Sequence, residues 1–560
     1  MKSKTPASGP LPAVSSFIPH PSSFSLSPGL RRLLTPHCLA AAAIIGLALL
    51  LHWRVAVGRS TRLLEHDEAI SLLAAAGKSK QMGGLYAQLN QDCLQVIPAK
   101  DLQDLTRPTG QTGLADVLES LAGRDIHPPL YFVTLHWIQR LAVTSNVLLR
   151  LFGTCLFLAA AWATARWVWP DAPPHAKLMG LALILTTPAL VGIATELRQY
   201  ALVSLGTLFS FAALITYWEA RRPILETIIL MSLAPALLIW SQYGTAVWVA
   251  ITLFLAAVRL FRGPPVCRKT FAGSVLIGIV LIVPLFLWQS YFLTVATRSA
   301  QGTVSLATLS EAASAISSGA GQAWCSLPER WHDPTVWILV VVVVLIISGA
   351  IVLTRRAAID QVLYCAAAAW AVVWVVWLAC EKVPQHAVSP KHLAPLLFCP
   401  LVLLVRATAS VNPPWMRRLA TTLLAASLLT HVGISAMRGL TERNPQRTVM
   451  ALRSADCLLI DVPKRGYILP LVAQMKPEAR VIIASPETAI AHWLEMNRLF
   501  PNEGLIVAEI DSCHGGRRAP GAQEFFDRLS RTYRDVAALR KGPHRTITEF
   551  KNKLSLKADS

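Results

Sequence analysis

Long apolar runs separated by short polar segments dominate the first 440 residues of the chain. A run of about 20 apolar residues can cross the hydrocarbon core of a bilayer, roughly 30 Å thick, as one helix. We predict about eleven such spans, and up to about thirteen if marginal segments also cross. They lie near residues 38–57, 147–168, 176–194, 200–218, 224–240, 243–260, 271–292, 335–354, 361–380, 393–405 and 419–437.

An additional apolar segment, 128–143, is of marginal length for a span. It either crosses the membrane or packs into the bundle from one side. If it stays on one side, the basic loops between the later spans all face the cytoplasm together with the N-terminus, as the positive-inside rule requires. The first loop, 58–127, and the C-terminal tail then face outward. We therefore predict an outward tail and leave the path of 128–143 open.

The two ends of the chain have different patterns. Residues 1–36 are rich in Ser and Pro and predict a disordered cytoplasmic leader. In the tail, 438–560, short apolar runs at 457–460, 481–484 and 505–508 read as buried strands. Helical patterns lie at 486–499 and 520–540. This alternation predicts a small soluble α/β domain with a largely parallel sheet.

Composition agrees with a membrane protein. The 560 residues are 54% hydrophobic and only 15% charged, with a mean hydropathy of +0.48, whereas about a quarter of a soluble chain is charged. The net charge of +20 raises the question of nucleic acid, but the basic residues lie mostly in short loops, so we expect a lipid bilayer and no nucleic acid as partner. The predicted fold is an all-α polytopic membrane bundle over 37–437 with a small C-terminal α/β domain.

Candidate chemistry begins in the polar interval from Arg62 to Tyr131. Asp67 and Glu68 follow the first span, in a segment whose apolar residues suit an amphipathic helix at the membrane surface. A carboxylate there can act as a general base or hold a metal ion. The alternative is an ordinary charged helix face. A divalent metal is thus possible, but no metal-ligand spacing is present and no metal site is assigned.

Other polar residues lie where predicted spans meet the outward face. His127 precedes Pro128 and Pro129, which fit the start of a helix, and Asp125 is two residues upstream. The bland alternative there is a rigid helix entry with a capping Asp. Further residues at outward mouths are Glu196, Arg198 and Tyr200, Tyr243, and Lys391 with His392. Arg198 and Lys391 could bind a lipid phosphate. Alternatively, Arg198 closes the turn by a local pair with Glu196, and Lys391 is an interfacial lysine that snorkels to the membrane surface.

The order of these motifs carries a resemblance. Asp67-Glu68 is followed by the element 125–131 (Asp-x-His-Pro-Pro-Leu-Tyr), the turn 196–200 (Glu-x-Arg-x-Tyr) and the element 389–392 (Ser-Pro-Lys-His). In this order they resemble the bacterial polytopic glycosyltransferases related to dolichyl-phosphate-mannose–protein mannosyltransferases and lipid A aminoarabinose transferases, of the type-C glycosyltransferase superfold. The resemblance covers about residues 38 to 405, and the tail is similar only in architecture.

The resemblance implies an inverting hexosyl or pentosyl transfer from a polyprenyl-phosphate sugar to a glycan, lipid or protein acceptor on the outward face of the bacterial inner membrane. It makes Asp67 the catalytic carboxylate, with Glu68 beside it. The donor site would comprise His127, Arg198, Tyr200, Lys391 and His392, with Asp125, Glu196 and Tyr243 in support. Two departures concern donor choice: the late element usually carries Arg-Tyr where this chain has Lys391-His392, and Gln199 stands where a hydrophobic residue is commoner.

Two other classes of protein fit parts of the pattern. A transporter or flippase of a lipid-linked or small polar substrate would have charged or broken helices near mid-membrane and internal repeats, but the ionisable residues gather at one face and no repeat is evident. A structural membrane protein with a partner-binding tail explains the tail but leaves the clustered carboxylates and histidines without a role. The sequence names neither the sugar nor the acceptor.

Overall fold

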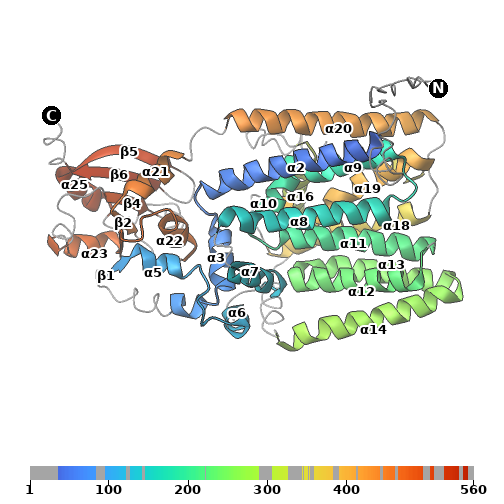
Figure 1. The fold of residues 1–560 in the computed structure, drawn as a ribbon, viewed down its shortest axis with the longest axis horizontal. Helices are drawn as coiled ribbons and strands as arrows, with labels where there is room; N and C mark the ends of the chain where they lie inside the picture. Colours follow the sequence, from blue (N-terminus) through green and yellow to red (C-terminus); the bar gives the residue numbers. More distant parts are fainter. Residues whose placement is uncertain are drawn as a thin grey trace, which may run out of the picture.

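The computed structural model of the protein describes residues 36–83, 95–121, 127–141, 145–220, 222–288, 306–325, 343–344, 346–350, 352–353, 358–381, 390–410, 414–441, 446–460, 465–492, 494–495, 505–509, 522–541 and 546–552. A helical bundle and a smaller α/β domain lie end to end, with short helices of the first loop between them (Figure 1). The predicted leader, residues 1–36, falls almost entirely outside the described residues.

The bundle confirms the predicted helical membrane class. Seven described helices are long and apolar enough to cross a membrane, or eight if one bent pair counts as a single span. Helix α19, with 17 residues, falls just below that length, and the predicted span 335–354 lies mostly outside the described residues. The predicted span 419–437 lies in α20, which has 28 residues but is not among the seven. The bundle comprises α2 (Pro36–Ser60), α8 (Asn146–Ala163) with the π-helical η2 (Thr164–Val168), α9 (Pro174–Thr186), α10 (Pro188–Thr195), α11 (Tyr200–Glu219), α12 (Ile224–Ser241), η3 (Tyr243–Thr245), α13 (Ala246–Arg262), α14 (Pro265–Trp288), α16 (Leu306–Cys325), α18 (Ala358–Glu381), η5 (Pro390–His392), α19 (Ala394–Ser410) and α20 (Pro414–Thr441).

The span predicted at 176–194 is broken into α9 and α10, which meet at an angle of 55°. Pro188 begins α10 and has no N–H to continue the hydrogen bonding of α9. The hydroxyls of Thr186 and Thr187 donate to the carbonyls of Ala182 and Leu183, both at 2.6 Å. Such side-chain bonds bend helices further, so the break is built into the local sequence.

Strands β2 to β6 of the tail and β1 of the first loop form a six-stranded sheet with the order β1-β3-β2-β4-β6-β5. The three predicted strands are confirmed as the parallel centre, β3-β2-β4, whereas the pairs at both edges are antiparallel. The helix predicted over 520–540 is wrong beyond Thr532, because Tyr533 begins a strand that pairs with β6. The elements are β1 (Gln95–Pro98), α21 (Gln446–Ser454), β2 (Cys457–Ile460), α22 (Arg465–Val472), β3 (Arg480–Ile483), α23 (Pro486–Ala491), β4 (Leu505–Glu509), α25 (Ala522–Thr532), β5 (Tyr533–Lys541) and β6 (Thr546–Asn552).

Alternate residues of the central strands enter two different cores, as the two-residue repeat of a strand requires. Cys457 and Leu459 of β2 pack with Phe525 and Leu529 of α25 on one face. Leu458 and Ile460 lie on the other face, in a core that also contains residues of the first loop and of α22. One face of the sheet is therefore closed by the tail alone, and the other faces the membrane domain.

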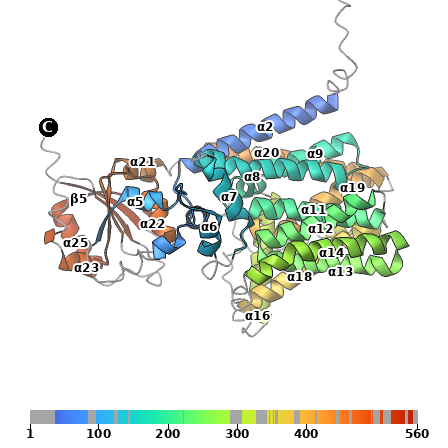
Figure 2. The same cartoon turned by 60° about the horizontal axis from the view of Figure 1, so that its bottom comes forward.

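The described parts of the first loop contain the short helices α3 (His66–Ala75), α5 (Ala99–Asp104) and α6 (Leu114–Leu121), and α7 (Leu130–Arg140) follows the loop. Helices α6 and α7 lie between the bundle and the sheet in both views (Figures 1 and 2), and α3 lies there in Figure 1. Helix α7 has 11 residues and is about 16 Å long at 1.5 Å per residue, roughly half of what a bilayer crossing needs. The segment left open in the sequence therefore packs against one end of the bundle.

The first loop and the tail form one structural unit. Strand β1 of the loop pairs with β3 at the edge of the sheet, an addition that the sequence did not predict. The amide of Gln103 donates to the carbonyls of Val472 and Met475, both at 2.9 Å. In return, the amide of Gln474 donates to the carbonyl of Arg62 at 3.0 Å, just before α3. The tail thus holds both ends of the segment that carries Asp67.

We predict that Gln103→Ala lowers the free energy of unfolding by about 1–3 kcal/mol, because two partly buried carbonyls lose their donor. Thermal unfolding of the purified full-length protein measures the loss. The matched control is Gln523→Ala, which removes an exposed bond to Asp527 within α25 and should shift the midpoint little. Equal midpoints for the two variants would contradict the role assigned to Gln103.

Candidate functional site

A buried ion pair fixes helix α3 to the bundle. The side chains of Glu68 on α3 and Arg150 on α8 are 2% and 1% exposed. Both guanidinium Nη atoms donate to the carboxylate, Nη2 to Oε2 at 2.8 Å. The backbone N–H of Leu197 donates to Oε1 of Glu68 at 3.1 Å, and Arg150 also donates to the carbonyl of Thr195 at 2.8 Å. Glu68 and Arg150 therefore join α3, α8 and the turn 196–199.

Close packing of α8 against α10 makes this junction possible. A Cβ atom at Gly153, one turn beyond Arg150, would lie 2.0 Å from the carbonyl oxygen of Ala194. Only glycine allows the two backbones to approach so closely. This approach brings the guanidinium of Arg150 beneath the turn that follows α10.

Glu68 is placed differently from the sequence prediction of a catalytic residue. Burial by itself would raise the pKa of its carboxyl, but the hydrogen bonds and positive charge of Arg150 outweigh burial and lower the pKa. Both oxygens already accept hydrogen bonds, Oε2 also from the backbone N–H of Glu65 at 3.2 Å. A carboxylate that is buried and fully bonded cannot take a proton from an incoming molecule, so its geometry is that of an anchor.

Asp67, the adjacent residue, faces the other way. Its side chain is 44% exposed, and one carboxylate oxygen lies 3.5 Å from Nη2 of Arg198, which is itself 6% exposed. Arg198 also donates to the Asp67 carbonyl and to the hydroxyl of Ser71, at 3.4 and 3.3 Å. Its Nη2 lies 3.3 Å from Nε2 of His127. The structure therefore brings together Asp67, His127 and Arg198, three of the predicted site residues.

Four further predicted residues, Glu196, Tyr200, Lys391 and His392, continue this polar cluster. The Tyr200 hydroxyl lies 3.1 Å from Nε2 of His392. Arg198 and Lys391 lie over the Tyr200 ring, with the guanidinium carbon and the ammonium nitrogen 5.8 and 5.0 Å from its centroid. Lys391 also donates to Glu196 at 2.8 Å. One aromatic ring is thus contacted by two cations.

The neighbouring residues Lys391 and His392 have pKa values shifted in opposite directions. Burial would lower the pKa of Lys391, but the carboxylate of Glu196 outweighs burial and raises it. At the neighbouring His392, burial together with the charges of Lys391 and Arg198 outweighs the Asp67 carboxylate and lowers the pKa to about 4. At neutral pH Lys391 is therefore charged and His392 is neutral, so the imidazole can accept the Tyr200 hydroxyl proton in a hydrogen bond.

Three further predictions have separate outcomes. Asp125 lies outside the described residues. Tyr243 is buried in η3. Among the described residues, no group of three or more His, Cys, Asp or Glu side chains could hold a metal ion.

Sequence reasoning missed Arg150, although a signal was present. It lies inside the apolar run 147–168, and an arginine within a membrane segment is costly unless it is paired or functional. Its partner could not be identified from the sequence, because Glu68 is 82 residues away. Ser71 carried no signal, since a serine on a short helix is commonplace.

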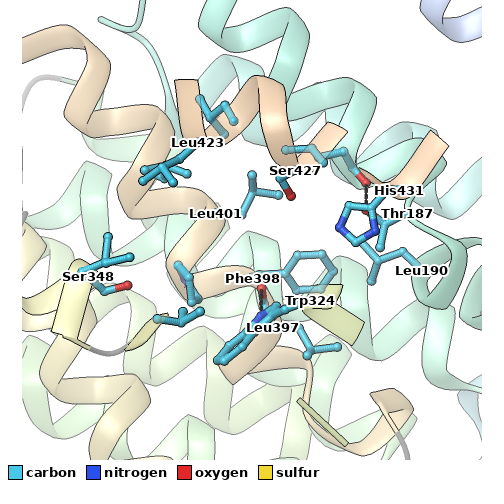
Figure 3. A pocket seen from close by; sticks show the side chains of 16 residues that line it. Thr187, Leu190, Trp324, Ser348, Leu397, Phe398, Leu401, Leu423, Ser427 and His431 are labelled. Atoms are coloured by element: carbon cyan, nitrogen blue, oxygen red, sulfur yellow. Dashed lines mark hydrogen bonds between the residues drawn. The ribbon is translucent and has the colours of Figure 1, made fainter. Parts of the chain in front are cut away.

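An apolar pocket of about 240 Å³ lies within the bundle at the break between α9 and α10. Side chains from α9, α10, α16, α19 and α20 line it, and His431 and Thr187 lie together at one side (Figure 3). Leu401 and Phe398 of α19 face its interior (Figure 3). The pocket and the polar cluster are close along the chain, since the lining residue Leu397 follows His392 by five positions and Leu190 precedes Glu196 by six.

Comparison with solved structures returns polytopic transferases. The chain is similar to ArnT from Cupriavidus metallidurans bound to undecaprenyl phosphate, with a TM-score of 0.46, 12% identity, and 91% of this chain and 97% of that chain covered. For the apo form of the same ArnT the TM-score is 0.48 and the identity is 11%, with 91% of this chain and 97% of that chain covered. For the arabinofuranosyltransferase AftD from Mycobacteria the TM-score is 0.40 and the identity is 15%, with 91% of this chain and 40% of that chain covered.

These matches include the aminoarabinose transferase group that the sequence motifs resemble. At identities of 11 to 15% the likeness concerns the fold alone, and with TM-scores below 0.5 it carries no argument about chemistry. No family model and no curated protein matches the chain. The function is therefore inferred from the site itself.

We predict that Glu68→Ala lowers the free energy of unfolding by about 3–5 kcal/mol, because it leaves the Arg150 charge buried without its partner. The matched control is Glu119→Ala, which breaks an exposed pair with Lys80 worth about 0–1 kcal/mol. Thermal unfolding at neutral pH distinguishes the two variants.

The same pair gives a pH dependence with a defined sign. Because the folded-state pKa of Glu68 is lowered, its contribution is complete above the unfolded value of about 4.3 and is lost as the pH falls through the folded value. Wild type should therefore lose stability below about pH 4.3 more steeply than Glu68→Ala. Parallel acid curves for the two proteins would contradict the assignment.

Proposed function

We propose that the protein is a membrane glycosyltransferase that uses a polyprenyl-phosphate sugar as donor. The observation that carries this proposal is the pairing of an exposed carboxylate, Asp67, with a buried arginine, Arg198, at one end of an apolar bundle. A reaction that expels a lipid phosphate needs a base for the acceptor and positive charge for the leaving group within one site. Asp67 supplies the first and Arg198 the second.

In the proposed reaction, Asp67 accepts the proton of an acceptor hydroxyl or amine as that atom forms a bond to the anomeric carbon. The bond from this carbon to the phosphate oxygen breaks on the opposite side, and its electron pair leaves with the polyprenyl phosphate. The configuration at the anomeric carbon is therefore inverted. The partial exposure of Asp67 leaves room for an acceptor, whereas the buried Glu68 keeps α3 in place.

Positive charge for the phosphate comes from Arg198 and Lys391, which share the Tyr200 ring. Arg198 offers a planar fork of donors and Lys391 a point charge. Each is paired with a carboxylate in the described structure, Arg198 with Asp67 and Lys391 with Glu196. An incoming phosphate would compete for Arg198 and release Asp67, so donor binding would free the base that the reaction needs.

The apolar pocket gives the lipid part of the donor a place. It is lined mainly by Leu, Val, Ile and aromatic side chains, and burying each CH₂ group there contributes about 0.8 kcal/mol. Its volume suits a segment of a hydrocarbon chain. The few residues between this pocket and the polar cluster match a ligand whose charged head is joined directly to an apolar chain.

One feature favours the alternative, a transporter or flippase. Broken helices such as α9–α10 often form substrate sites in transporters. The break here, however, is lined mainly by apolar groups, with His431, two serines and threonine hydroxyls that donate to backbone carbonyls. The acidic and basic side chains of the proposed site lie at the end of the bundle beside the first loop. This distribution supports the enzyme.

We predict that Asp67→Asn lowers kcat by about 10²–10⁴-fold, the usual contribution of a general base, while thermal unfolding remains unchanged. Purified protein is incubated with radiolabelled polyprenyl-phosphate sugars, and released polyprenyl phosphate is measured. Asp101→Asn, an exposed aspartate on α5 of the same loop, is the matched control. Full turnover by Asp67→Asn would exclude Asp67 as the base.

We also predict that Leu401→Trp raises KM for long-chain donors by about tenfold or more, because losing the burial of two CH₂ groups costs about 1.6 kcal/mol. A short-chain donor with the same sugar phosphate, which does not reach the pocket, is the internal control and should keep its KM. The same rise for both donors would show that the pocket does not hold the chain.

A further inference from the structure

A second cavity lies at the other end of the bundle, away from Asp67. Its volume is about 920 Å³, and it is lined by the start of α9, the end of α19 and the first three turns of α20. Helices α9 and α20 both begin at the end of the bundle far from the sheet (Figure 1). The polar lining residues are Asp171, His175, Thr408, Arg417, Arg418, Thr421 and Thr422.

Arg417 and Arg418 in the cavity differ from the nearby Arg406 in exposure and in their bonding partners. Arg406 is buried and bonded to Asp360, Glu219 and a backbone carbonyl. Arg417 and Arg418 are exposed, and within the described part of the chain neither has a hydrogen-bonding or ion-pair partner for its side chain. Asp171 is the one carboxylate among the lining residues, so the two arginines leave the cavity with a positive charge.

The surroundings of the cavity indicate the level of the membrane surface. Trp415 and Leu419, on the same two turns of α20, are 61% and 45% exposed. Tryptophan is enriched where a membrane protein meets the headgroups of the bilayer. A cationic cavity between helices at this level has the form of sites that hold anionic lipid headgroups, and its volume exceeds what a free phosphate ion needs.

We propose that this cavity binds the phosphate of an anionic phospholipid headgroup through Arg417 and Arg418, on the face predicted to be cytoplasmic. The lipid chains would lie against the exposed apolar residues of α20. The site is separate from the polar cluster of the proposed donor site, because α9 and α10 together, 21 helical residues or about 30 Å of helix, lie between the two. On α20 its lining residue Thr422 is next to Leu423 of the apolar pocket. Its occupancy does not depend on the proposed glycosyl transfer.

The test compares the full-length protein with Arg417→Gln/Arg418→Gln and with a matched control, Arg268→Gln/Lys269→Gln. In both pairs two adjacent exposed basic residues follow the first proline of a long helix, Pro414 of α20 or Pro265 of α14, at the same spacing. Only the first pair lines the cavity. Binding of phosphatidylglycerol and of phosphatidylcholine to each purified protein in detergent is titrated by native mass spectrometry.

We expect wild type and the control pair to bind phosphatidylglycerol in preference to phosphatidylcholine. The Arg417/Arg418 variant should bind phosphatidylglycerol about 30-fold more weakly, since each basic residue contributes about fivefold. Its unfolding midpoint in phosphatidylcholine alone should match that of wild type. Equal losses in the two variant pairs, or equal binding of both lipids by wild type, would overturn the proposal. Displacement by glycerol phosphate at lipid-like concentrations would also overturn it, because the ligand would then be a soluble phosphate.

Discussion

The buried ion pair between Glu68 and Arg150 is the interaction on which the rest of the site depends. Two opposite charges at 2% and 1% exposure are tolerable only with good geometry and further hydrogen bonds, and the N–H of Leu197 and the carbonyl of Thr195 supply these bonds. Because the pair joins α3, α8 and the turn after α10, it fixes Asp67 on one element relative to Arg198 on another. Gly153 permits it by letting the α8 and α10 backbones approach.

Two adjacent carboxylates thus have opposite surroundings. Glu68 is enclosed and neutralised by Arg150, whereas Asp67 is 44% exposed beside a cation that it touches at 3.5 Å. On a helix, neighbouring residues point about 100° apart. Glu68 therefore points into the bundle, while Asp67 points toward Arg198 and solvent. The tail adds rigidity because its β3 pairs with β1 of the first loop, its Val472 carbonyl accepts from Gln103, and its Gln474 donates to the carbonyl of Arg62. The segment carrying Asp67 is therefore held from the membrane side and from the α/β domain.

The hydrophobic pattern was enough to predict the helices that face lipid and the strands that are set by their local sequence. The spans near 38–57, 200–218 and 224–240 and the strands at 457–460 and 505–508 follow from local sequence. What it could not supply were partners distant in sequence. The pairing of β1 with β3 joins residues nearly 400 positions apart, and Tyr533–Lys541 forms a strand because β6 is available to it. Similarly, Asp67, His127 and Arg198 were each singled out, but the role of Glu68 depended on Arg150, which only the packing of α8 reveals.

The most direct measurement is a cryo-electron microscopy structure of the full-length protein with polyprenyl phosphate bound. If the protein uses a lipid-phosphate sugar donor at this site, the phosphate will lie within hydrogen-bonding distance of the Arg198 guanidinium and Lys391, the Arg198–Asp67 contact of 3.5 Å will lengthen, and part of the chain will enter the pocket beside Leu401. A phosphate bound away from Arg198 and Lys391, with the contact to Asp67 unchanged, would contradict the proposed function.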